Sequence, residues 1–174
     1  LNLLVHLVLC ALVLQLVFSI DIVVSTWSGA FESGTAAAYA TLTAPSSSPL
    51  DAVEVGASTC EDQRCDGSVG YGSHPDSRGH SSLDALIMDG SSMDVGAVAY
   101  LRKYRNAISL ARQVMVYTDH TLIVGEGAED FATMLGLLKP APATTNDTLA
   151  AYKDWILADC QPNYYTNLNG ANTS

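Results

Sequence analysis

Two apolar stretches separated by a turn occupy residues 82–102, and they constrain the fold more than any other feature of the chain. The stretches "SLDALIMDG" and "MDVGAVAYLR" are joined by a turn at Gly90–Ser92. Apolar runs on either side of a turn rich in glycine and serine are typical of a β-hairpin. We therefore expect an antiparallel strand pair, against which the remaining elements must pack.

Helical and strand patterns surround this hairpin. Ser48 is a suitable helix N-cap, because Pro49 then occupies the first helical position and Asp51 follows three residues after the cap. Asp147 or Thr148 is expected to cap the last helix. This order of elements predicts a layered α/β or α+β sandwich. The expected elements are strands at 21–27 and 120–125 and helices at 34–43, 49–62, 106–118, around 128–136 and at 149–160.

The first 18 residues contain no Asp, Glu, Lys or Arg. Such a run is typical of a signal-peptide core, with Val17 and Ser19 as small residues before cleavage after Ser19. The run is nearly long enough to span a membrane, so a retained signal anchor is the second interpretation and a buried helix is the third. We expect residues 1–19 to be a cleaved signal peptide, because a strand pattern that begins the domain follows directly.

The mature part, from residue 20 to 174, suits one domain, because 48% hydrophobic residues in a 174-residue chain suffice for a core. The chain carries 18 acidic and 8 basic residues, a formal charge of -10. Such an acidic surface repels phosphate backbones, which argues against a nucleic acid partner. The triplets that begin at Asn146 and Asn172 are glycosylation sequons, which fit a secretory compartment.

Cysteine spacing leaves two interpretations open. Cys60 and Cys65 lie five positions apart, and in an oxidising compartment we expect them to form a disulfide, with Cys160 left without a partner inside residues 20–174. Zinc binding with His74 and His80 is the alternative, because four residues separate the cysteines and five separate the histidines. Only eight residues separate the two pairs, however, whereas zinc fingers have 12 or more.

The glycine-rich run "DGSVGYGS" after Cys65 matches no nucleotide or serine-hydrolase motif. A P-loop would need a lysine after the glycines, and none is present. A nucleophile elbow around Ser68 would need glycine at position 66, where Asp66 stands. The remaining interpretations are a turn whose glycines supply positive φ and a backbone that lines a pocket closely.

Aromatic and acidic residues supply further candidates. Trp27 and Phe31 follow the first predicted strand, where they could form a pocket wall, although a buried core Trp explains the pattern equally well. Asp84, Asp89 and Asp94 could suggest a cation site, but solvated hairpin carboxylates are the commoner explanation and no EF-hand spacing is present.

Several stretches of the chain closely resemble one enzyme family, the glycosylasparaginases. They are "VVSTW", "LDAVEVGASTCEDQRCDGSVGYG", "LDALIMDGSSMDVGAVAYLRKYRNAI", "HTLIVGEGAEDFA" and "DWILADCQPNYY", and together they extend from about Asp21 to Tyr165. The most specific combination is "CDGSVG" followed by "LDALIMDG".

This resemblance implies an α+β fold, the αββα four-layer sandwich of N-terminal nucleophile hydrolases. The family precursor cuts itself before a threonine, and the resulting α and β chains stay together, commonly as a heterotetramer. The threonine hydroxyl then attacks the amide that links N-acetylglucosamine to asparagine, with the threonine's own α-amino group as base. No cofactor or metal is implied, and the expected location is the lysosome or the secreted fraction.

The resemblance also implies roles for individual residues. Trp27, Phe31 and Ser68 are expected at the substrate pocket, and the Cys60–Cys65 disulfide is expected to staple a helix end to a turn. Three residues separate Trp27 from Phe31 here, whereas the family usually has Trp-x-Phe.

The nucleophilic threonine is expected beyond Ser174, so residues 20–174 correspond to an incomplete αββα domain, the α-chain region. Thr148 in "NDTLA" imitates the nucleophile motif but precedes "DWILADC", which lies upstream of the cleavage site in the family. The chain alone is therefore expected to be inactive. The alternatives are a truncated, inactive homologue that acts as a binding protein and an asparaginase-like relative on the same fold.

Overall fold

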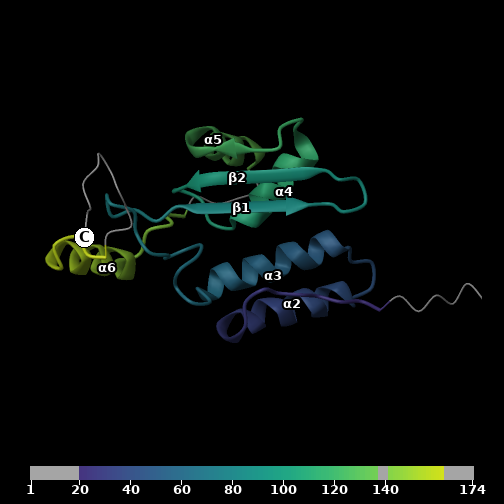
Figure 1. The fold of residues 1–174 in the computed structure, drawn as a ribbon. Coiled ribbons are helices and arrows are strands. Elements are labelled where there is room, and N and C mark those ends of the chain that lie inside the picture. The colour runs from purple at the N-terminus through teal and green to yellow at the C-terminus, as the bar shows by residue number, and fades with distance from the viewer. Residues whose placement is uncertain (1–19, 137–140, 163–174) are drawn as a thin grey trace, which may run out of the picture.

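The computed structural model describes residues 20–136 and 141–162 (Figure 1). Helices predominate, and the strands form a small mixed sheet, which confirms the α+β class. The elements are η1 (Gly29–Phe31), α2 (Glu32–Leu42), α3 (Pro49–Gln63), β1 (Leu83–Met88), β2 (Val95–Leu101), α4 (Ala107–Tyr117), β3 (Ile123–Val124), α5 (Gly125–Leu135) and α6 (Asn146–Leu157).

The sheet has the strand order β1-β2-β3. β1 and β2 form the predicted antiparallel hairpin, in which Leu86 is paired with Ala97 and Met88 with Val95. β3 pairs with β2 in parallel, and the chain reaches it through α4. The predicted strand at 120–125 is therefore present but limited to Ile123–Val124.

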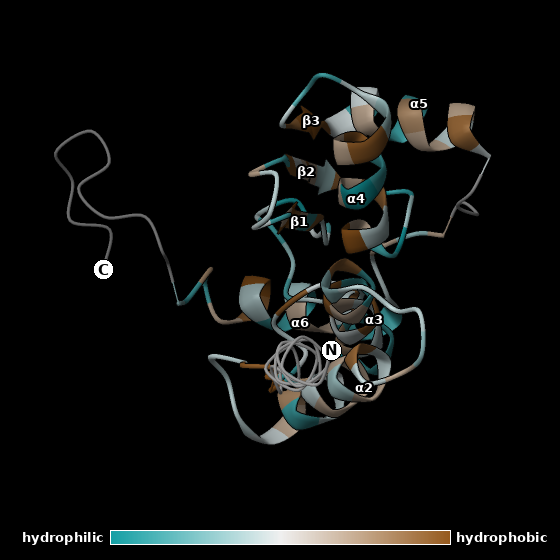
Figure 2. Cartoon of the chain, turned by 90° about the vertical axis from the view of Figure 1, so that its right-hand side faces the viewer, coloured by the Kyte–Doolittle hydropathy of each residue, from teal (hydrophilic) through white to brown (hydrophobic). Residues whose placement is uncertain are grey.

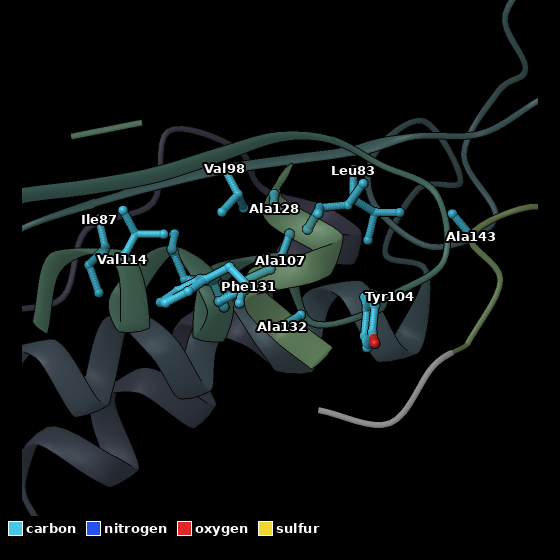
Figure 3. Close-up of a cluster of buried hydrophobic side chains, with 14 residues drawn as sticks. Leu83, Ile87, Val98, Tyr104, Ala107, Val114, Ala128, Phe131, Ala132 and Ala143 are labelled. Carbon is cyan, nitrogen blue, oxygen red and sulfur yellow. The ribbon is translucent and has the colours of Figure 1, made fainter. Parts of the chain in front are cut away.

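The hydrophobic core lies between one face of the sheet and helices α4 and α5. Leu83 and Val98 of the strands belong to one buried cluster with Val114 of α4 and Phe131 of α5, and all four are nearly inaccessible to solvent (Figure 3). Figure 2 shows both helices on the same side of the strands, with no described helix on the opposite side.

The α2–α3 pair lies beyond the β1 edge of the sheet, with α3 against α4 (Figures 1 and 2). Small residues allow the two helices to approach closely. A Cβ placed on Gly34 would lie 2.8 Å from the carbonyl oxygen of Gly56, and one on Gly56 would lie 2.9 Å from the Cβ of Ala38. The predicted packing of the small-residue stretch 34–43 as a helix is therefore correct.

The start of α3 confirms the expected cap. The backbone N–H of Asp51 donates to the Ser48 hydroxyl, and the backbone N–H of Ser48 donates to the Asp51 carboxylate, with Pro49 at the first helical position. Such a reciprocal pair satisfies two N–H groups that a helix start leaves without partners. The hydrogen bonds from Ser48, supported by Arg112, lower the pKa of Asp51 to about 2.

Two predictions about the elements are wrong. Residues 21–27 form no strand, because no strand in the described part lies beside them to complete a ladder, and Ile22 and Val24 are largely exposed. The cap of α6 is Thr145, whose hydroxyl accepts from the backbone N–H of Thr148, so Asp147 and Thr148 lie inside the first turn.

The expected signal peptide at 1–19 lies outside the described residues, as do residues 137–140 and 163–174. None of the helices that the structure describes combines the length and the apolar character needed to cross a membrane.

Replacing Gly96 with Ala should destabilise the protein strongly. A Cβ on Gly96 would overlap the carbonyl oxygen of Ala111 and lie 2.5 Å from the backbone nitrogen of Met115, so α4 would have to move away from β2. We expect a loss of at least about 2 kcal/mol in the free energy of unfolding, measured in urea. Gly90→Ala is the control, because a Cβ there meets nothing within 4 Å. Equal stability of the two variants would contradict this packing.

Candidate functional site

A groove of about 660 Å³ runs between residues 22–26, the helices α2 and α3, and strand β1. Its wall is mainly apolar and includes Ile22, Val24, Phe31, Ala52, Val69 and Leu86. Two carboxylate residues, Glu61 and Asp84, also line it. A largely apolar groove with few polar groups has the character of a ligand site.

The aromatic pair predicted for the pocket wall lies together at one end of this groove. The ring centroids of Trp27 and Phe31 are 5.9 Å apart, and the rings are tilted relative to each other. Phe31 lines the groove, whereas Trp27 lines a shallower hollow beside it with Glu32 and Tyr39. Trp27 is 68% exposed, so the alternative of a buried core Trp is wrong. The exposed ring is available to a ligand or to a second chain.

Cys60 and Cys65 form a disulfide at the end of α3, with their Cα atoms 5.2 Å apart. Between them, Arg64 ends the helix in the left-handed conformation at φ 55°, and its N–H donates to the carbonyl of Glu61. The disulfide occupies both sulfurs that the zinc alternative would require as ligands. Cys160 has no disulfide partner among the described residues.

The glycine-rich loop at 66–72 follows the disulfide. Gly67, Gly70 and Gly72 all have φ near +72°, which side chains with a Cβ rarely adopt. The Ser68 hydroxyl and backbone N–H both donate to Asp66, and these bonds lower the pKa of the Asp66 carboxyl. Ser68 itself is exposed and lies outside the groove lining, whereas its neighbours Val69 and Gly70 line it. The structure thus places Ser68 at the rim of the groove.

Glu61 is a groove residue that the sequence did not single out. It is only 9% exposed, and its carboxylate accepts from the backbone N–H groups of Asn106 and Ala107. Burial raises the pKa of the Glu61 carboxyl above its usual range, although both backbone donors and Arg105 act in the opposite direction.

The sequence around Glu61 did not predict its burial. Glu54, Ser58 and Glu61 recur along one helical face, where each meets a polar group of the α4 segment. Polar residues at this spacing usually indicate a solvated face, so the pattern alone pointed the other way.

The acidic residues of the hairpin are mainly solvated, as the commoner explanation held, since Asp84 and Asp94 are exposed and Asp89 is partly exposed. The Asp84 carboxylate accepts from the backbone N–H of Tyr100 at 2.7 Å, close to the irregularity in the β1–β2 register. Asp89 accepts from the backbone N–H and hydroxyl of Ser91 within the turn. Across residues 20–136 and 141–162, no group of three or more His, Cys, Asp or Glu side chains is placed to hold a metal ion.

Buried hydroxyl groups fix α6 against the rest of the chain. The hydroxyls of Ser81 and Thr148 both donate to the carbonyl of Ser73, and both side chains are inaccessible to solvent. Thr148 is therefore engaged as a packing residue. Asn146 of the first predicted sequon is exposed at the start of α6, and Asn172 of the second lies outside the described residues.

Comparisons with known proteins identify relatives along most of the chain. A family model described as Asparaginase matches residues 21–173. The chain is 46% identical over 149 residues to the N(4)-(beta-N-acetylglucosaminyl)-L-asparaginases of Rattus norvegicus and Mus musculus, matching 86% of this chain and 42% of each relative. It is 43% identical over 151 residues to a probable isoaspartyl peptidase/L-asparaginase 3 of Arabidopsis thaliana, matching 87% of this chain and 41% of that relative. These matches confirm the resemblance to the glycosylasparaginases, and the chain spans about two fifths of the length of these relatives.

Alkylation of the unreduced protein should leave Cys60 and Cys65 unmodified, because both sulfurs are in the disulfide. Cys160 should react, unless it is bonded to a cysteine beyond residue 174. Mass spectrometry of tryptic peptides before and after reduction measures both outcomes. Alkylation of Cys60 and Cys65 without reduction would contradict the disulfide. The Cys60–Cys65 loop is short, so the bridge should shape the turn more than it stabilises the fold.

Proposed function

The chain belongs to the asparaginase family, and from this membership we propose that it is the α-chain region of an amidohydrolase that cleaves the N4-(N-acetylglucosaminyl)-asparagine bond. The observation that carries the proposal is its 46% identity to two mammalian relatives that bear the name of this activity. The groove with its aromatic pair supports it, because a substrate of this kind carries a sugar ring that can pack against an exposed aromatic face.

The proposed nucleophile is the hydroxyl of an N-terminal threonine on a β chain released from the same precursor. Its own α-amino group takes the hydroxyl proton, the hydroxyl oxygen attacks the amide carbon, and the glycosylamine leaves with that proton. Water then releases aspartate from the ester. Thr148 is not a candidate for this role, because its buried hydroxyl is bonded to Ser73.

In this proposal, residues 20–174 supply the substrate-facing wall of the pocket. Trp27 and Phe31 contact the substrate, and Ser68 orients groups at the rim. Ser68 is hydrogen-bonded to Asp66 and has no histidine partner within the described part of the chain, which favours an orienting role over attack.

The β chain is proposed to pack on the sheet face opposite α4 and α5, which completes a four-layer sandwich. On this face Leu86 is 61% exposed, and Met88 and Val124 are also substantially exposed. Residues 20–27 form an apolar segment that pairs with no described strand. Such a segment has free backbone N–H and C=O groups that a strand of a second chain could bond. An unpaired segment and a bare apolar sheet face are what a second sheet would cover. Two such α–β pairs would form the proposed heterotetramer.

The same proposal assigns roles to the N-terminal apolar run and to the two glycosylation sequons, and it gives the location of the protein. Residues 1–19 act as a signal peptide, and Asn146 and Asn172 carry glycans. The mature protein then acts in the lysosome or is secreted, without a membrane anchor or a nucleic acid partner.

A second candidate activity is the hydrolysis of isoaspartyl peptides or asparagine. The 43% identity to the Arabidopsis thaliana protein favours it, because this value is close to the 46% of the mammalian relatives. The two activities differ in what lies beyond the scissile amide, so substrate choice separates them.

The full-length protein that contains this chain should hydrolyse a glycosylated asparagine, whereas residues 1–174 alone should not. Trp27→Ala in the full-length protein should lower kcat/KM by about 5- to 150-fold, corresponding to ~1–3 kcal/mol for one aromatic wall. Initial rates with the glycosylated asparagine, a β-aspartyl dipeptide and free asparagine measure this. Faster turnover of the dipeptide would favour the second candidate, and full activity of the isolated chain would overturn the β-chain nucleophile.

Replacing Leu86 with Lys should weaken the association of the two chains, because a charge would be buried in the apolar layer between the sheets. Co-purification of the two chains after self-cleavage measures the association. Met134→Lys is the matched control, since Met134 is 76% exposed on α5, away from the proposed interface. Unchanged co-purification of the Leu86 variant would place the second chain elsewhere.

A further inference from the structure

Glu61 occupies the corner where α3, α4 and the glycine-rich loop meet. It follows Cys60 of the disulfide and belongs to the last turn of α3. Carboxylates are rarely buried unless they are fully partnered. The partners of Glu61 therefore indicate what holds it there.

The first partner is the start of α4. A helix start leaves backbone N–H groups without acceptors, and its N-cap side chain commonly accepts from them. Here the N-cap is Asn106, which lies at φ 65° and makes no side-chain cap; its side chain accepts instead from the Ser58 hydroxyl. The Glu61 carboxylate accepts instead from the N–H groups of Asn106 and Ala107, two of the donors that the helix start leaves without partners, and the positive end of the helix favours a negative charge at this position.

The second partner is the loop itself. A Cβ placed on Gly70 would lie 2.9 Å from the Cγ of Glu61, so the loop backbone rests directly on the aliphatic part of the glutamate side chain. The next loop residue is held from the α4 side, because the Arg105 guanidinium lies 3.7 Å from the centre of the Tyr71 ring. Arg105 is fixed in turn by Asp62, the neighbour of Glu61, at 2.7 Å.

We propose that Glu61 is a positioning residue that, together with Arg105, clamps Gly70 and Tyr71 and thereby fixes the rim of the groove at which Ser68 stands. The clamp acts through its contacts with the loop, so its role is one of positioning. Its relevance to turnover rests on the proposed function, whereas its effect on the loop does not.

The test uses Glu61→Gln in the full-length protein, with amide hydrogen exchange as the readout. The variant keeps the size of the side chain but replaces one acceptor oxygen with an amide donor that faces backbone N–H groups. We expect exchange at residues 69–73 to become about tenfold faster, the effect of losing one hydrogen bond to a charged group. Exchange in α5 should not change. Arg105→Gln should loosen the same residues, and it provides the test if Glu61→Gln does not fold.

Glu54→Gln is the matched control. Glu54 lies on the same face of α3 and is also bonded to α4, through Ser109 and Arg112, but it does not contact the loop. It should leave exchange at 69–73 unchanged. Glu61→Asp keeps the charge and should restore part of the protection.

Equal loosening by the Glu54 and Glu61 variants, or faster exchange throughout the protein, would overturn the proposal, because Glu61 would then have only a general structural role. Unchanged exchange at 69–73 in both clamp variants would overturn it as well. In an active enzyme, the Glu61 variant should alter KM or kcat more than Glu54→Gln does at a matched Tm. If the wild-type protein hydrolyses none of the three substrates while loop exchange responds as expected, the proposed function fails and the clamp stands.

Discussion

The close contact between α4 and β2 at Gly96 is the constraint on which the rest of the structure depends. Only a residue without a side chain allows the strand backbone to lie directly against the backbone of α4 at Ala111 and Met115. This approach brings Leu110, Ala111 and Val114 onto the sheet, where they are fully buried. The interior would lose its close packing if the helix were held further away.

The position of α4 then determines where the groove lies. Its polar face meets α3 through a ladder of side-chain contacts, in which Arg112 pairs with Asp51 and Glu54, and Glu61 caps the helix start. Most of these charges are partly buried and have close partners, so they specify how α3 sits against α4. The disulfide and the glycine-rich loop follow at the Glu61 end of these contacts. The groove lies between this end of α3 and the irregular segment at 22–26.

One face of the sheet is therefore committed to the core, whereas the other is bare in the described part of the chain (Figure 2). The alternation along β1 places Leu83 and Ile87 in the core and Leu86 and Met88 on the bare face. Apolar residues on both faces are typical of a strand that is covered on both sides. The relatives are more than twice as long as the matched segment, and a second layer on this face is consistent with their length.

The sequence by itself determined the local elements and the family. Turn residues around Gly90 predicted the hairpin, and the Ser48–Asp51 spacing predicted the start of α3, because both depend on backbone preferences of a few neighbouring residues. Tertiary structure alone decided which strand patterns are paired, since a strand needs a neighbouring strand to bond with. Residues 21–27 have no such neighbour in the part of the chain that the structure describes. It also decided that Glu61 is buried and that Thr145 caps α6 in place of Asp147 or Thr148. The burial of Glu61 depends on Asn106, which lies 45 residues further along the chain. The cap of α6 depends on the burial of Thr148 against Ser73. A local sequence pattern cannot predict either contact, because the partners are distant in the chain.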